Sequence, residues 1–101
     1  MGSIHTNDGI LFYLGGECVL VKRRLSKILS ENTCSMEYIN QTIQESRDVL
    51  SQMEPYAKMN IPQVNQQYSE LENLCERAEK ILTKRQQVAN NILSRLRSYL
   101  R

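Results

Sequence analysis

The side chains best suited to chemistry in this chain of 101 residues are three cysteines and a single histidine. Cys18, Cys34 and Cys75 form no Cys-x-x-Cys pair, so neither a zinc site nor a disulfide framework is indicated. A nucleophilic site needs a base beside the nucleophile, and His5 lies in a terminal segment, where chains are usually mobile. We therefore expect no enzyme activity, no metal and no other cofactor, with reduced thiols typical of the cytoplasm or nucleus.

Two other patterns also lack what their chemistry would need. Glu70, Glu72, Glu76 and Glu79 recur at helical spacings, which is typical of the solvated side of a helix rather than of a paired-carboxylate site. Gly15-Gly16 lacks both the glycine spacing and the Lys-Ser/Thr pair of a phosphate-binding loop. The function is therefore expected to reside in surfaces and not in a reactive centre.

The composition is typical of a single, mostly α-helical domain. Hydrophobic residues make up 41% of the chain and charged residues 24%, with five Tyr, one Phe and no Trp. The apolar run over 10–14 is far shorter than the roughly 20 residues of a membrane-spanning helix. Asp8 precedes that run and no basic segment does, so we expect neither a membrane span nor a signal peptide.

Two long stretches carry side chains at alternating spacings of four and three residues. The positions in the first stretch are Leu25, Leu29, Asn32, Met36, Ile39, Ile43, Ser46, Leu50 and Met53. Those in the second are Val64, Tyr68, Leu71, Cys75, Ala78, Leu82, Arg85, Ala89, Ile92, Leu96 and Tyr99. This heptad spacing predicts two helices, over 21–53 and from Val64 to the C-terminus, each roughly 50–60 Å long. Cys75 would then be a small core residue.

Two prolines mark the break between these predicted helices. Pro55 and Pro62 disfavour the α conformation in the residue before them and lack an amide hydrogen, so we expect a break over 54–62. Asn60-Ile61-Pro62 is typical of a helix start. A short connection favours an antiparallel helical hairpin over residues 21–101, with a kinked rod as the alternative.

Each of the two heptad series forms a seam along one side of its predicted helix, and the polar members of the two seams give this hairpin a register. With the turn near residue 58, Asn32 would lie opposite Arg85. A shared polar layer of this kind fixes register at some cost in stability.

Residues 1–20 form a separate N-terminal arm in this interpretation. Two short apolar runs flank Gly15-Gly16, and glycines suit the positive-φ positions of a tight turn, so a β-hairpin or an extended docking arm is favoured. An irregular segment and a short helix that continues into the first long one remain open.

The apolar faces are too wide for a two-helix hairpin. Several side chains beside the seams widen them, as in helices of three- or four-helix bundles, and an uncovered strip is rare on monomers. The candidate partner-binding residues are Leu74, Ile81, Val88, Leu82, Ile92, Leu96, Ile28 and Val49. We expect other helical protein subunits to cover them in a hetero-oligomer. The alternative is that the N-terminal arm folds back over part of the strip.

Charge is distributed unevenly along the chain. Residues 1–79 contain seven Lys/Arg and eleven Asp/Glu, whereas residues 80–101 contain six Lys/Arg and no acid. In the hairpin, a basic pole would form from Lys22, Arg23, Arg24, Lys27, Arg95, Arg97 and Arg101, together with Lys80, Lys84 and Arg85. The pole would suit an acidic protein surface, while interaction with the helix dipole is the simpler explanation. The scarcity of aromatic residues among the basic ones disfavours nucleic acid.

Short motifs in the middle of the chain resemble known helical subunits. Leu20-Val-Lys22 through Val49-Leu-Ser-Gln-Met-Glu-Pro55-Tyr to Asn60-Ile-Pro62 resembles the smallest shoulder subunit of dynactin, in which a heptad helix also runs into an acidic-residue-Pro step and then Ile-Pro. Glu54-Pro55-Tyr56 before a heptad helix is similar to snapin and related subunits of organelle-positioning complexes. Both resemblances imply a helical subunit of a cytoskeletal or organelle-transport complex, and neither supplies functional residues.

The sequence therefore predicts a non-enzymatic scaffolding subunit of a helical assembly, located in the cytoplasm, with the nucleus as the alternative. Two alternatives remain. A regulatory module would recruit an acidic partner through the basic pole. A prefoldin-like chaperone arm would use paired helices and a β-hairpin, although prefoldin places its hairpin between the two helices.

Overall fold

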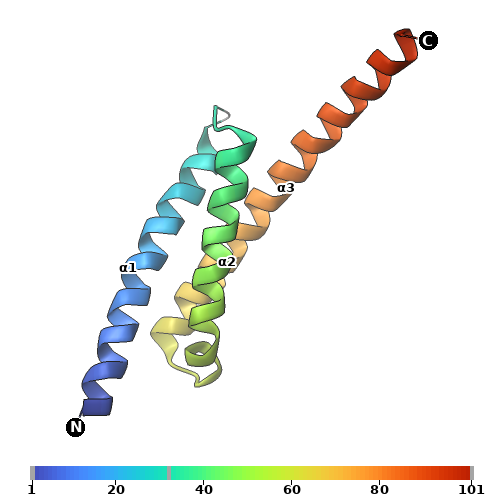
Figure 1. The fold of residues 1–101 in the computed structure, drawn as a ribbon. Coiled ribbons are helices and arrows are strands. Elements are labelled where there is room, and N and C mark those ends of the chain that lie inside the picture. Colours follow the sequence, from blue (N-terminus) through green and yellow to red (C-terminus); the bar gives the residue numbers. More distant parts are fainter. Residues whose placement is uncertain (1, 32, 101) are drawn as a thin grey trace.

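The computed structural model describes residues 2–31 and 33–100, and within them the chain forms three α-helices and no strand. Helix α1 spans Gly2–Ser30, α2 spans Met36–Lys58 and α3 spans Pro62–Tyr99. Successive helices alternate in direction, and α3 continues well past the end of α1 and α2 (Figure 1). The radius of gyration is 18.1 Å, against about 13 Å for a compact domain of this length. The prediction of a mostly α-helical chain is confirmed, and the shape is an elongated three-helix bundle.

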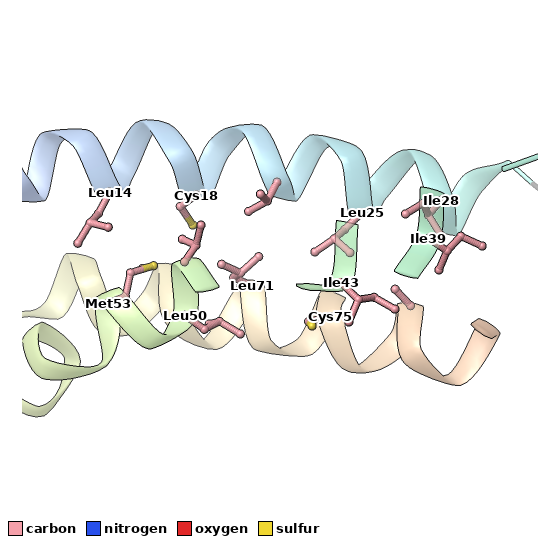
Figure 2. Close-up of a cluster of buried hydrophobic side chains, with 13 residues drawn as sticks. Leu14, Cys18, Leu25, Ile28, Ile39, Ile43, Leu50, Met53, Leu71 and Cys75 are labelled. Atoms are coloured by element: carbon pink, nitrogen blue, oxygen red, sulfur yellow. The ribbon is translucent and has the colours of Figure 1, made fainter. Parts of the chain in front are cut away.

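One hydrophobic core joins the three helices (Figure 2). Its buried side chains are Leu14, Cys18, Val21, Leu25, Ile28, Ile39, Ile43, Val49, Leu50, Met53, Leu71, Cys75 and Ala78. Those on α1 recur at spacings of four and three, which places them on one side of the helix. Burial of each Leu or Ile contributes about 1.5–3 kcal/mol, so packing rather than helix propensity holds the fold together.

The predicted seams of the second and third helices are confirmed in the part that the core covers. Every seam position of α2 from Ile39 to Met53 is buried, and so are Leu71, Cys75 and Ala78 of α3. On α1 the seam passes through Leu25 and the other core residues, whereas the predicted seam residue Leu29 is only half-buried. The seam on α1 is therefore rotated relative to the prediction.

The expected β-hairpin at the N-terminus is wrong for the described residues, because the segment belongs to α1. No described glycine has a positive φ, so Gly15 and Gly16 do not form a tight turn. Glycine in a helix interior costs about 0.5–1 kcal/mol relative to alanine. The burial of Leu14, Cys18 and Val21 at helical spacing outweighs that cost. The third alternative, a helix that continues into the next segment, is the observed structure.

The predicted continuous helix over 21–53 is interrupted between Ser30 and Met36, where the described residues 31 and 33–35 form a loop. Ser35 ends this loop as the N-cap of α2, and its side-chain oxygen accepts a hydrogen bond of 3.1 Å from the Tyr38 amide. Asn32, the predicted polar member of the seam, lies outside the described residues. The loop lets α1 fold back on α2, so the two halves of the predicted helix become neighbours in the bundle.

The turn between α2 and α3 is shorter than the predicted break over 54–62. Helix α2 includes Pro55 and ends at Lys58. The helix continues through the proline because Pro55 lies in its last turns and the preceding Met53 is held in the core. Asn60 has a φ of 58°, a left-handed conformation that asparagine tolerates better than most residues. Pro62 occupies the first turn of α3, as predicted.

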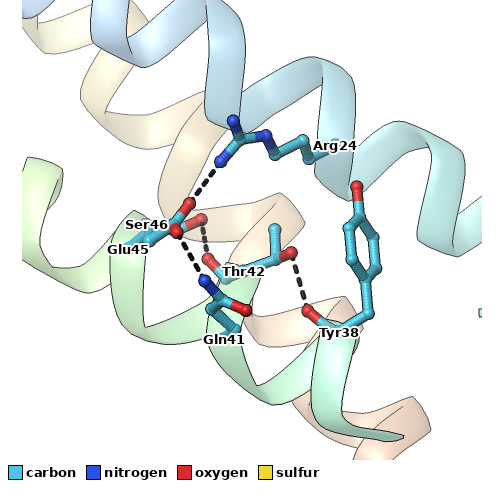
Figure 3. Close-up of polar contacts among 6 residues, drawn as sticks. All are labelled: Arg24, Tyr38, Gln41, Thr42, Glu45 and Ser46. Atoms are coloured by element: carbon cyan, nitrogen blue, oxygen red, sulfur yellow. Dashed lines mark hydrogen bonds and ion pairs between the residues drawn. The ribbon is translucent and has the colours of Figure 1, made fainter. Parts of the chain in front are cut away.

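Small polar side chains lie within the α2 face that packs in the core (Figure 3). The Thr42 hydroxyl donates to the Tyr38 carbonyl at 2.8 Å, and the Ser46 hydroxyl donates to the Thr42 carbonyl at 2.7 Å. Both hydroxyls are thereby satisfied within the helix. At the edge of this face, Arg24 of α1 forms an ion pair with Glu45 of α2.

Candidate protein-interaction surface

The last part of α3 leaves the bundle. The Arg85 guanidinium donates a hydrogen bond of 2.5 Å to the carbonyl of Cys34 in the loop between α1 and α2, which places Arg85 at the end of the bundle. Residues 86–100, which we call the arm, are all exposed. At about 1.5 Å per residue the arm extends roughly 22 Å beyond this point. Figure 1 shows it without a neighbouring helix.

The arm carries a continuous apolar face. The members of this face, which we call the arm face, are Val88, Ile92, Leu93, Leu96, Tyr99 and Leu100. Their exposed fractions range from 52% for Leu96 to 86% for Tyr99 and Leu100. The sequence interpretation had not included Leu93 and Leu100, although Leu93, Leu96 and Leu100 are also spaced by three and four residues.

The other predicted partner-binding residues lie within the bundle. Ile28 and Val49 are buried by the chain's own helices, so in this structure they are core residues and offer no surface to a partner. Leu74, Ile81 and Leu82 are half-buried and pack against the same core. Helix α1, whose N-terminal half was only one of the open alternatives for residues 1–20, supplies this cover, as in the alternative that the N-terminal segment folds back over the strip. Of the predicted set, Val88, Ile92 and Leu96 remain exposed.

The predicted basic residues are not gathered at one end. Lys22 of α1 pairs with Glu70 of α3 at 2.5 Å, and Arg24 pairs with Glu45. Arg95 lies 25 residues after Glu70 on the same helix, which corresponds to roughly 38 Å.

The remaining predicted members of the pole are spread along α1 and α3, with Lys80, Lys84 and Arg85 between Glu70 and Arg95 on α3. Arg23 and Lys27 are exposed on α1, and Arg97 is exposed on the arm. Arg101 lies outside the described residues. The arm therefore extends its own basic charges beyond the bundle.

Electrostatic contacts stabilise the packing of the helices at the bundle surface. The hydrogen bond from Lys22 lowers the pKa of the Glu70 carboxyl below its ordinary value. A second ion pair joins Arg47 of α2 to Glu79 of α3. These contacts join α1 and α2 to α3 at the bundle surface.

The cysteines behave as core residues. Cys18 and Cys75 are buried, and desolvation raises the pKa of both thiols above the ordinary value. The predicted core position of Cys75 is confirmed. Its thiol lies 3.9 Å from a Glu79 carboxylate oxygen.

Helix α1 presents a second exposed apolar group, away from the core. Its members are Phe12, Tyr13, Val19 and Leu20. Phe12 is 86% exposed, whereas Val19 and Leu20 are close to half exposed. The sequence interpretation assigned these residues to the N-terminal arm and therefore did not place them on a helix surface.

One pocket of about 110 Å³ lies between α1 and the turn that joins α2 to α3, and its lining includes Leu14, Met53 and Tyr56. Among the described side chains, no three metal-ligating groups come together. None of the helices, over the residues described, is both long and apolar enough to cross a bilayer.

Comparison with known proteins gives no match. No family model, curated protein or solved structure matches this chain. The resemblances to the dynactin shoulder subunit and to snapin therefore stay predictions.

Proposed function

We propose that this chain is a non-enzymatic structural subunit of a helical protein assembly, and that the arm is the element through which it joins its partners. The observation that carries this proposal is the arm face, because six large apolar side chains stand exposed on a helix that projects from an otherwise packed bundle. Contiguous apolar surface of this kind marks interaction sites more often than free surface.

The bundle and the arm have different roles in this proposal. The bundle buries its own core, including Ile28 and Val49, and so supplies a rigid base. The arm continues the same helix without a break, so its position is fixed by the packing of Leu71, Cys75 and Ala78 below it. A partner helix would add to the arm the burial that α1 and α2 give to the rest of α3.

The resemblance to dynactin and snapin subunits is what connects this role with a cytoskeletal or organelle-transport complex in the cytoplasm. The prefoldin-like alternative loses its basis, since it required a β-hairpin and the described residues contain no strand.

The decisive experiment is purification of the tagged chain from the cells that produce it, together with the variant Ile92→Gln/Leu96→Gln. We expect the wild-type chain to bring down helical partners in stoichiometric amounts and the variant to lose them. The melting temperature of the isolated variant should equal that of the wild type, because both side chains are exposed.

The matched control is Asn91→Gln/Ser94→Gln, which places the same new side chains on the polar side of the arm. This variant should keep its partners. If the wild-type chain purifies alone as a monomer, or if the arm-face variant retains every partner, the proposed role is wrong.

A further inference from the structure

We propose that the arm face binds an α-helix of a different protein whose apolar seam is flanked by acidic side chains. This inference rests on the proposed function and specifies the chemistry of the partner.

The arm face continues an interface that the structure already contains. Leu82 packs against the core of the bundle, and Ala89 and Leu96 follow it at intervals of seven residues, on the same side of α3. Helices α1 and α2 cover this side of α3 in the bundle. Helix α1 ends and helix α2 begins near Arg85, so neither covers α3 beyond that level. The uncovered part of α3 therefore presents to a partner the same heptad surface that packs against helices inside the chain. A lipid surface would not require that the heptad phase continue.

Basic side chains border the arm face on both edges. Arg95 follows Val88 by seven residues, and Lys84 precedes Val88 by four, so both lie along one edge. Arg97 follows Leu93 by four residues and lies along the other edge. In the heptad phase set by Leu82 and Ala89, Arg95 directly flanks the seam, at a position from which charges of paired helices select their partners. Lys84 and Arg97 lie one position further from the seam.

The centre of the opposite side of the arm is uncharged, with Gln87 and Ser94 among its residues, and no acidic residue occurs after Glu79. An acidic partner helix complements this pattern on both edges at once.

A second copy of the chain complements it poorly. Two arms packed together would bring Arg95 and Arg97 of one copy against basic edges of the other, and like charges across an interface oppose pairing. The glutamates of the bundle are partly engaged already, since Glu45, Glu54, Glu70 and Glu79 form ion pairs within the chain.

The test uses the full chain and three synthetic heptad peptides of the length of the arm, each with leucine at the seam and with Glu, Lys or Gln at the flanking positions. Fluorescence anisotropy of each labelled peptide measures its affinity. We expect the Glu-flanked peptide to bind roughly tenfold or more tightly than the Lys-flanked one, and to bind more weakly as salt is raised.

Two variants with equal net charge separate position from overall charge. Arg95→Gln/Arg97→Gln should weaken binding of the Glu-flanked peptide by roughly threefold to tenfold. Gln87→Glu/Ser94→Glu lowers the net charge by the same two units, but places it on the far side of the arm, and should retain most of the affinity.

Three results would overturn the inference. These are equal binding of the Glu- and Lys-flanked peptides, tighter binding to phosphatidylserine-containing vesicles than to any peptide, and self-association of the chain through the arm in sedimentation experiments. Equal peptide binding would leave the role as a helical subunit intact. That role fails separately, when Ile92→Gln/Leu96→Gln changes no partner in the purification experiment.

Discussion

At the scale of single residues, ion pairs on the surface join neighbouring helices of the bundle. Lys22 and Glu70 connect α1 to α3, and these two residues would lie far apart in the two-helix hairpin predicted from the sequence. The depressed pKa of the Glu70 carboxyl is a direct consequence of this contact. The pKa of the Glu70 carboxyl therefore indicates whether α1 is packed against α3.

We predict that Glu70→Gln makes the folded state less sensitive to acid. Because the folded-state pKa of Glu70 is lowered, its contribution to stability is present above the ordinary value of 4.5 and is lost as pH falls below it toward the folded-state pKa. Wild type should therefore lose more of its melting temperature than the variant between pH 6 and pH 3, measured by circular dichroism. Glu72→Gln removes an exposed carboxylate from the same helix and serves as the control. Identical acid profiles for wild type and Glu70→Gln would contradict the pairing.

At the scale of elements, the most informative segment is the first half of α1. This part of the helix contains Gly9, Gly15 and Gly16, although glycine has a low helix propensity. A Cβ atom built at each of these positions meets nothing within 4 Å. The glycines therefore cost conformational entropy on folding, although no close packing contact requires glycine at these positions.

We predict that Gly16→Ala stabilises the chain by about 0.5–1 kcal/mol, because alanine favours the helix and fits the open space. The expected rise in melting temperature is roughly 2–8 °C for a domain of this size. The opposite sign is expected if residues 15–16 form a tight turn with positive φ, where alanine is strained. Thermal unfolding of the two proteins thus distinguishes the helix from the β-hairpin predicted from the sequence.

At the scale of the whole molecule, the helices differ in length and the difference creates the exposed surface. Helix α3 has 38 residues, whereas α1 has 29 and α2 has 23. The buried core residues of α3 end at Ala78, and neither α1 nor α2 reaches beyond the level of Arg85. The molecule reaches 72 Å in its longest dimension because the arm continues beyond that level.

We predict that a chain ending at Arg85 keeps the stability of the bundle and loses its partners. The arm contributes no buried residue to the core, so the melting temperature should change by no more than a few degrees. Circular dichroism should show the loss of the arm's helical signal, and purification from cells should recover no stoichiometric partner. A large loss of stability would show that the arm packs on the bundle in solution.

The sequence alone determined those features that depend on local chemistry and periodicity. Pro62 after Asn60-Ile61 fixed the start of α3, because proline suits a first helical turn and asparagine tolerates a left-handed φ. The spacing of Ile39, Ile43 and Leu71 identified the apolar sides of α2 and α3 correctly. These features need no knowledge of which helix packs on which.

The tertiary structure decided what covers each apolar side. Ile28 and Val88 both widened a predicted seam, yet Ile28 is buried by the chain itself while Val88 is exposed. Helical spacing defines the direction in which a side chain points, but burial depends on whether another helix reaches that level. The extension of α1 through Gly15-Gly16 and the reversal of the chain between α1 and α2 supplied that cover for the bundle and stopped short of the arm. Long-range packing overrode weak local preferences at both places, because the free energy of burying Leu14, Cys18 and Leu25 exceeds the cost of two glycines in a helix.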